Sequence, residues 1–201
     1  MKDVFTSNSD IQKTAYLNWR MQKGQTADNL ETMADSFASS AKILIQSMLD
    51  DNRDKKADSL IFPALFCIDH AIELYLKAIL REIALLKNIK TSGSITHDIK
   101  KLYNKMIEQI QGKDGTSEVN EYLRELENYI DELYSLIVDE NRAKVDFARY
   151  PVDSKDKEFF YIKSAGNTAV NIEELRDRFE LIEKKLSGLF QMYQSELEEK
   201  N

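Results

Sequence analysis

The chain has 201 residues, of which 42% are hydrophobic and 31% are charged, as is usual for one soluble globular domain. Its formal net charge of −7 opposes unselective coating of nucleic acid, which needs many Lys and Arg side chains to displace counterions from phosphates, although a local basic groove is compatible with it. The single cysteine, Cys67, excludes an internal disulfide and favours a reducing, cytoplasmic location.

The N-terminal residues have no apolar signal core, and the longest apolar run, from Leu60 to Ile68, is far shorter than the roughly 20 residues that a membrane span requires. We therefore expect a soluble protein without a membrane association. Residues 1–25 are amphiphilic but poorly patterned, which favours a short helix or an N-terminal arm that packs on the rest of the domain.

Most of the chain is predicted to be helical, because it contains only six glycines and two prolines. A first helix is expected over 27–49, where apolar residues recur at helical intervals. A second helix is expected to become regular with Pro63 in its first turn and to continue to about Lys87. Its apolar residues cover more than one face, so it is predicted to be the central helix of a bundle.

Thr96 is expected to cap a third helix, with Asp98 in its first turn and a buried face from Ile99 to Ile110. A fourth helix is predicted from Ser117 to about Glu140, with a solvated acidic outer face.

Short aromatic and β-branched segments over 145–171 favour a small β-hairpin or extended insertion. Asn171 with Glu174 then resembles a capping box that opens the last helix. The predicted fold is thus a single all-α domain over 1–201, an up-and-down bundle of four to five helices with this insertion before the last one.

Several kinds of site are discounted by the residue counts. With two histidines and one cysteine, the chain cannot assemble a structural zinc site, and neither histidine lies in a Glu-x-x-His pair of the carboxylate-bridged bundle type. It also has no glycine-rich phosphate loop, nucleophile elbow or dinucleotide fingerprint. We therefore expect no metal and no cofactor.

A polar stripe runs along the otherwise apolar second helix. Asp69, His70, Glu73, Lys77 and Arg81 follow each other at intervals of one, three and four residues, which puts them on one side of a helix. Glu73 and Lys77 form a favourable i,i+4 pair. The stripe is either a partly exposed structural seam or one wall of a site.

Two other segments carry polar groups. In "THDIKKLY" (Thr96 to Tyr103), His97 is either a residue at a capped helix start or an acid–base group. In "FARYPVD" (Phe147 to Asp153), Arg149 either pairs with an acid of the fourth helix or, beside aromatic residues, serves phosphate binding or base stacking. Basic residues outnumber acidic ones around both segments, which favours a positive pocket in a negative protein.

The long apolar helix containing "HAIELYLKAIL", the following "HD" segment and the arginine motif near the end of the bundle resemble the HEPN superfamily of nucleotide-binding helical domains over about residues 27–198. The resemblance implies a helical bundle, frequent homodimerisation and, in many members, RNA cleavage in toxin–antitoxin or phage-defence systems. It also implies an operon-encoded protein as a partner.

Catalytic HEPN ribonucleases carry a histidine four to six residues after the arginine. After Arg149 this chain reads "YPVDSKD" and after Arg142 "AKVDFAR", neither of which contains a histidine. The first hypothesis is therefore a nucleotide- or RNA-binding domain without standard ribonuclease chemistry. A helical scaffold or dimerisation module, and a ribonuclease that uses His97 with Arg149, are the alternatives, so enzyme activity stays open. The candidate ligand- and phosphate-binding residues are His70, Glu73, Lys77, His97, Asp98, Arg149 and Tyr150.

Overall fold

The computed structural model describes residues 3–89, 96–110, 116–136, 145–153 and 155–200. Within these ranges the fold is all-α, as predicted. The helices with their bounds are α1 (Thr26–Asp50), α2 (Lys56–Leu86), α3 (Ile99–Ile110), α4 (Thr116–Tyr122), α5 (Arg124–Leu136), α6 (Phe160–Lys163) and α7 (Ile172–Lys200), together with the 3-10 helices η1 (Ile11–Lys13) and η3 (Val145–Ala148).

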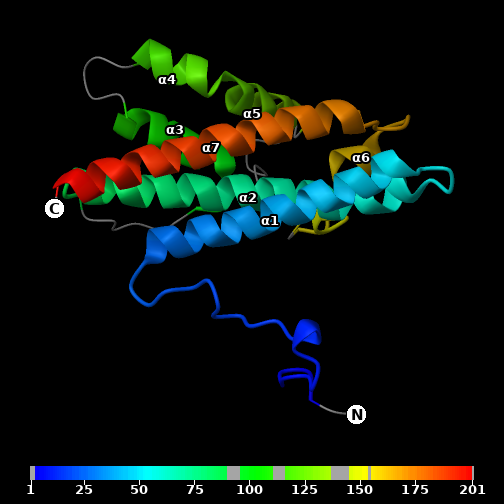
Figure 1. Cartoon of the computed structure of the whole chain (residues 1–201). Helices are drawn as coiled ribbons and strands as arrows, with labels where there is room; N and C mark the ends of the chain where they lie inside the picture. The colour runs from blue at the N-terminus through cyan, green and yellow to red at the C-terminus, as the bar shows by residue number, and fades with distance from the viewer. Residues whose placement is uncertain (1–2, 90–95, 111–115, 137–144, 154, 201) are drawn as a thin grey trace.

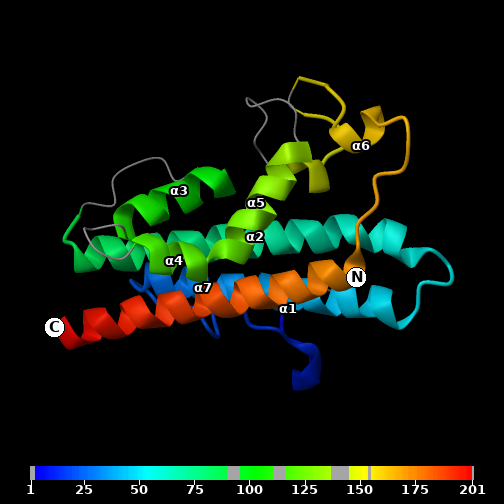
Figure 2. The same ribbon diagram turned by 90° about the horizontal axis from the view of Figure 1, so that it is seen from above.

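The long helices α1, α2 and α7 lie side by side. Helix α3 packs on α2, and α4 and α5 lie above α7 in the view of Figure 1, on the side away from α1 (Figures 1 and 2). Helix α2 packs against α1, α3, α7 and η3, which confirms its predicted central position. By length and composition it is also the one helix of the described residues that could cross a membrane, but a buried core helix passes the same test.

Buried alanines occur along both α1 and α2, the two helices that pack together most extensively. On α2 the buried alanines recur every seven residues, and on α1 three alanines have no exposed surface. Small side chains on facing helices let the helix axes approach closely. The alanines concerned are Ala57, Ala64, Ala71 and Ala78 on α2, and Ala34, Ala38 and Ala41 on α1.

The start of α2 differs from the prediction. The helix begins at Lys56, so Pro63 lies in its interior and not in its first turn. The side chain of Asn52 accepts a hydrogen bond from the backbone N–H of Ala57 at 2.9 Å and so satisfies one of the free donors of the true first turn. Pro63 removes one backbone hydrogen bond from α2, and the packing of the surrounding helix against α1 offsets this loss.

The helix predicted from Ser117 to Glu140 is divided in two at Leu123, and its expected last turn, 137–140, lies outside the described residues. Leu123 is fully buried, and i→i−4 hydrogen bonds continue across the division, from Leu123 N to Val119 O and from Glu127 N to Leu123 O. The two parts run in different directions in Figure 2.

No β-hairpin forms among the described residues of 145–171, so that prediction was wrong. The segment contains η3, the single turn α6 and one isolated bridge between Val152 and Glu158. Phe147 and Phe159 are both buried in the core, and each lies in or directly before a helical turn instead of a strand.

The start of α7 agrees with the prediction, because the Asn171 side chain accepts a hydrogen bond from Glu174 N at 3.3 Å. The N-terminal arm, residues 3–25, does not agree. It extends away from the bundle instead of packing on it (Figure 1), and its residues are exposed apart from Thr14 and Met21, which are half-buried.

Candidate functional site

Glu73, near the middle of α2, is the centre of a cluster of cationic and imidazole groups. Its Oε1 lies 2.5 Å from Lys77 Nζ and 2.9 Å from His97 Nδ1, and its Oε2 lies 3.8 Å from His70 Nδ1. These four residues, His70, Glu73, Lys77 and His97, are called the Glu73 cluster below. Three belong to the polar stripe of α2, and the fourth comes from the segment that leads into α3.

The electrostatics of the cluster favour an ionised Glu73. Burial alone would raise the pKa of this carboxyl, but the neighbouring His70 and Lys77 and the charge of His97 outweigh burial and lower the pKa to about 2. Glu73 and Lys77 are both buried, so on this part of the stripe the interpretation as a partly exposed seam was wrong.

Asp98, and not Thr96 as predicted, is the residue that caps α3, while the Thr96 hydroxyl accepts a hydrogen bond from Asp98 N at 3.1 Å. Asp98 Oδ1 accepts hydrogen bonds from Lys101 N at 3.0 Å and from the Tyr134 hydroxyl at 2.8 Å. This arrangement fixes the backbone next to His97, whose Nδ1 faces Glu73 while 77% of its side chain remains exposed. Asp98 therefore supports the Glu73 cluster without belonging to it.

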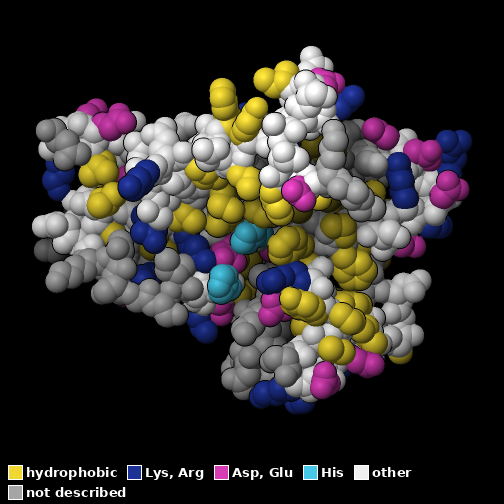
Figure 3. All heavy atoms as spheres, turned by 90° about the horizontal axis from the view of Figure 1, so that it is seen from below, with side chains coloured by type: hydrophobic (Ala, Val, Ile, Leu, Met, Phe, Trp, Pro, Cys, Tyr) yellow, Lys and Arg dark blue, Asp and Glu magenta, His cyan; other side chains and the backbone are white. Residues whose placement is uncertain are grey.

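The His70 ring lies between two phenylalanines. It is stacked on Phe66 with ring centroids 5.6 Å apart and planes 9° apart, and it is nearly perpendicular to the Phe37 ring, with centroids 4.4 Å apart. Figure 3 shows the two histidines of the chain next to each other on one face, surrounded by hydrophobic, acidic and basic side chains.

Arg149 approaches the same aromatic group from the turn after η3. Its guanidinium carbon lies 5.5 Å from the centre of the Phe66 ring and 5.4 Å from that of Tyr150. Among the described residues it pairs with Asp146, at a long 3.4 Å, and the predicted pairing with an acid of the fourth helix is not seen there. About half of the Arg149 side chain is exposed, which leaves its N–H groups accessible to a ligand.

The segment that carries Arg149 is attached to α2 by aromatic residues. The Tyr161 hydroxyl donates to the carbonyl oxygens of Phe147, at 3.1 Å, and Tyr150, at 3.2 Å. The Tyr161 ring also packs on Phe62, with centroids 5.2 Å apart. These contacts hold the backbone of Arg149 beside the first half of α2.

The structure thus gathers six of the seven predicted residues. His70, Glu73, Lys77 and His97 form the cluster, and Arg149 and Tyr150 join it through Phe66. The sequence reasoning treated Phe66 and Phe37 only as apolar helix residues. The spacing of Phe66 and His70, four residues apart on one helix, was a usable signal for Phe66, whereas nothing in the sequence links Phe37 to His70.

Asp69 of the stripe is separate from the cluster and buried in the core. Its Oδ1 accepts a hydrogen bond from the Tyr129 hydroxyl at 2.7 Å, and its Oδ2 is buried without a hydrogen-bond partner. Burial raises the pKa of Asp69 to about 7, with Glu73 adding to the effect and Tyr129 opposing it. This carboxyl therefore changes its charge near neutral pH.

The described residues hold no group of three or more His, Cys, Asp or Glu side chains that could bind a metal ion. A separate cavity of about 180 Å³ lies between α5, α7 and the segment before α7, with Leu65, Tyr129, Phe147 and Phe160 among its walls. Most of its lining is apolar, with Glu132, Glu174 and Arg178 also bordering it, and it does not include the Glu73 cluster.

No protein-family model, no curated protein and no solved structure matches this chain.

Proposed function

We propose that the protein is a HEPN-like helical domain that binds a nucleotide or a segment of RNA, and that it works in a toxin–antitoxin or phage-defence system. The observation that carries the proposal is the position of Arg149 over Phe66, the same ring on which His70 of the Glu73 cluster is stacked. The resemblance of the sequence to HEPN domains is the source of the biological context.

The chemistry of these groups suits a nucleotide. A guanidinium offers N–H donors in a planar fork that matches the oxygens of a phosphate, and the long contact with Asp146 competes only weakly for them. Tyr150 is exposed beside Arg149 and can stack on a base. Such a local site is compatible with a protein of net charge −7 because it needs few phosphate contacts.

Binding is tested with the full chain and two probes, AMP and a fluorescein-labelled single-stranded RNA of about ten nucleotides. Arg149→Ala should weaken RNA binding at least tenfold, since a charged hydrogen-bonding group is lost. Arg53→Ala is the matched control, because Arg53 is an exposed arginine that pairs with Asp51 outside the site, and it should change the affinity less than twofold. Equal affinities of wild type and Arg149→Ala would contradict the proposal.

A second candidate function, ribonuclease activity, is favoured by the contact between Glu73 and His97. A carboxylate that holds Nδ1 of an imidazole orients the ring so that Nε2 faces outward, as general acid–base catalysis requires. The exposed ring can present Nε2 to the 2′-hydroxyl group of RNA. The proton of this hydroxyl must be removed in metal-independent RNA cleavage.

In this reaction the 2′-oxygen forms a bond to phosphorus while the bond between phosphorus and the 5′-oxygen breaks. The 2′-proton passes to His97, His70 protonates the departing 5′-oxygen, and Arg149 stabilises the charge on the phosphate. The products are a 2′,3′-cyclic phosphate and a 5′-hydroxyl end. Cleavage of RNA by wild type, its loss in His97→Ala and the survival of a DNA strand of the same sequence would establish this function, whereas intact RNA would leave binding alone.

A further inference from the structure

The cavity of about 180 Å³ lies where α2, α5 and α7 meet η3, α6 and the segment before α7. Part of its lining is buried in the core, and the rest is partly or fully exposed, so the cavity opens to solvent on one side. Val170, of which 40% is exposed, belongs to that open side. The buried residues of the lining are Tyr129, Leu133, Phe147 and Leu175.

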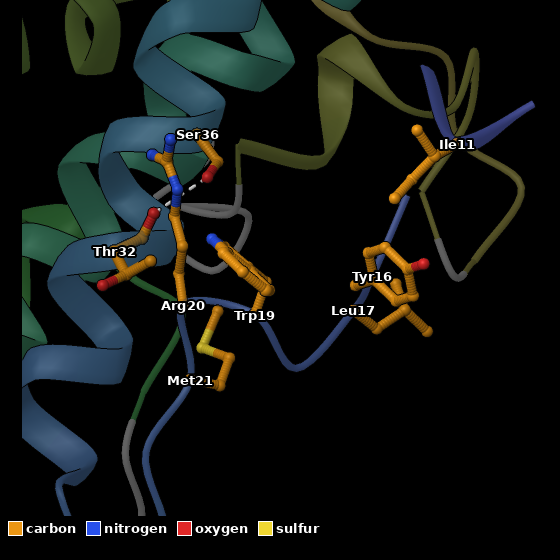
Figure 4. Close-up of a pocket in the computed structure, with 8 residues that line it drawn as sticks. All are labelled: Ile11, Tyr16, Leu17, Trp19, Arg20, Met21, Thr32 and Ser36. Atoms are coloured by element: carbon orange, nitrogen blue, oxygen red, sulfur yellow. Dashed lines mark hydrogen bonds between the residues drawn. The ribbon is translucent and has the colours of Figure 1, made fainter. Parts of the chain in front are cut away.

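The hollow beside the N-terminal arm is of a different kind (Figure 4). It measures about 460 Å³ and lies between the arm and α1, which contributes Thr32 and Ser36. All its lining residues are exposed or half-buried. Sites for small molecules bury most of the surface of the ligand, which exposed walls such as Leu17 and Trp19 do not achieve. The cavity between α5 and α7 is therefore the better candidate for a small ligand.

The volume and the walls of this cavity suit a single ring. An engineered protein cavity of about 150 Å³, lined by Leu, Ile and Phe side chains, binds benzene, and 180 Å³ leaves room for a short alkyl chain besides. A ring in the cavity would contact Tyr129, Phe147 and Phe160. These contacts are favourable because they remove hydrocarbon surface from water and allow aromatic rings to pack together.

Charged side chains border the cavity on the side of α5 and α7. The Arg178 guanidinium donates hydrogen bonds to Glu132 and, from Nη2 at 3.2 Å, to Glu174. Glu125 lies 4.0 Å from Arg178 Nε. Three carboxylates thus surround one guanidinium, which gives this group a net charge of −2.

Two of these carboxylates remain accessible to a ligand. The side chains of Glu132 and Glu174 are 66% and 61% exposed, and both residues line the cavity. A carboxylate accepts several hydrogen bonds, so the contacts with Arg178 leave acceptor positions on both residues. An apolar cavity therefore meets a negatively charged group at its open side.

We propose that the cavity binds a small hydrophobic amine, with the ring or alkyl group among the apolar walls and the ammonium facing Glu132 and Glu174. The net negative charge of the neighbouring group attracts an ammonium and repels a carboxylate, which sets the specificity. This site is separate from the one proposed for nucleotide or RNA, because Arg149 and the Glu73 cluster do not line the cavity.

Isothermal titration calorimetry of the full chain with three probes tests the proposal. Phenethylamine, 2-phenylethanol and 3-phenylpropionate attach an ammonium, a hydroxyl and a carboxylate to the same phenyl ring through a short chain. Phenethylamine should bind with a Kd of about 1 mM or below. The alcohol should bind about fivefold more weakly, since it keeps the ring contacts but lacks the charge, and the carboxylate should bind more weakly still.

The charge is tested with the double variant Glu132→Gln/Glu174→Gln. The amide oxygens can still accept hydrogen bonds from Arg178, but the net charge of the group rises from −2 to zero. Phenethylamine should then bind about fivefold more weakly, while the affinity for 2-phenylethanol should stay the same. Glu180→Gln/Glu199→Gln is the matched control, because it removes the same charge from exposed positions of α7 outside the lining. It should change either Kd less than twofold.

The position of the ligand is tested with Val170→Phe. The larger side chain occupies the open side of the cavity, so both the amine and the alcohol should bind at least about tenfold more weakly. Val4→Phe, at an exposed valine of the N-terminal arm, is the matched control and should bind both probes as wild type does. Both positions are exposed, so an unchanged melting temperature shows that each variant is folded.

Three results would overturn the proposal. They are no binding of phenethylamine up to about 10 mM, equal affinities of wild type for the amine and the alcohol, and unchanged binding of both by Val170→Phe. Arg149→Ala should bind phenethylamine as wild type does, because Arg149 does not line the cavity. The amine site and the RNA site are thus tested by different variants and fail independently.

Discussion

Glu73 Oε1 lies 2.9 Å from His97 Nδ1, and this contact joins the middle of α2 to the residue that precedes the capped start of α3. The contact connects the buried ion pair of Glu73 and Lys77 to the exposed imidazole of His97. The carboxylate has two tasks as a result, because it neutralises a buried ammonium and orients an exposed imidazole.

Replacing Glu73 tests how much its carboxylate stabilises the buried Lys77 ammonium. Glu73→Gln leaves the Lys77 ammonium buried without its counter-ion, so the free energy of unfolding should fall by about 3 kcal/mol. Urea denaturation measures the loss. The double variant Glu73→Gln/Lys77→Met removes both charges and should recover at least half of it. Equal midpoints for wild type and Glu73→Gln would mean that the pair contributes nothing.

The buried carboxyl of Asp69 should make the free energy of unfolding depend on pH. Its pKa in the folded protein, about 7, exceeds its usual value of 3.8, so the folded state binds more protons than the unfolded state between these pH values. Stability must then decrease as the pH rises through this range. Relative to Asp69→Asn, the wild-type protein should lose about 3 kcal/mol of unfolding free energy between pH 5 and pH 8.

Chemical denaturation at several pH values measures this difference. Burial also raises the pKa of Glu31 and of Glu82, but both residues are present in both proteins, so the difference isolates Asp69. Parallel stability curves for wild type and Asp69→Asn would show that the buried carboxyl does not titrate near neutral pH.

A substitution at Phe66 should weaken ligand binding without lowering the stability of the fold. Its ring contacts both Arg149 and His70 but is only half-buried. Phe66→Leu should therefore weaken RNA binding about fivefold through the loss of a cation–π contact, with little effect on thermal unfolding. Tyr122→Leu, which removes the cation–π contact between Lys185 and Tyr122 outside the site, is the matched control and should bind normally. Similar affinities for the two variants would remove Phe66 from the site.

Substitutions at Asp98 test how much its two hydrogen bonds stabilise the backbone next to His97. Asp98→Ala removes the acceptor for Lys101 N and for the Tyr134 hydroxyl, so it should cost about 1–2 kcal/mol of stability. Asp98→Asn keeps a cap oxygen and should cost less than about 0.5 kcal/mol. Thermal denaturation distinguishes the variants, and an equal loss in both would show that the charge, and not the cap, is what matters.

Helix positions followed from the sequence wherever apolar residues kept a regular period. The bounds of α1, the end of α2 and the Asn171 cap of α7 agree with the prediction to within one residue, because periodicity and capping are local properties. The predicted start of α2 was wrong because the position of Pro63 was interpreted from the local sequence alone. A proline is common in a first turn, and only the packing of α2 makes one acceptable in its interior.

The sequence by itself determined an all-α chain with a long central helix, and it identified the residues of a polar stripe. Only the tertiary structure decided that Glu73 and Lys77 are buried, that His97 bonds to Glu73 and that Phe66 lies between Arg149 and His70. The physical reason is that periodicity describes one helix at a time. Distances between side chains on different elements depend on how those elements pack, and Arg149 is separated from Phe66 by 83 positions along the chain.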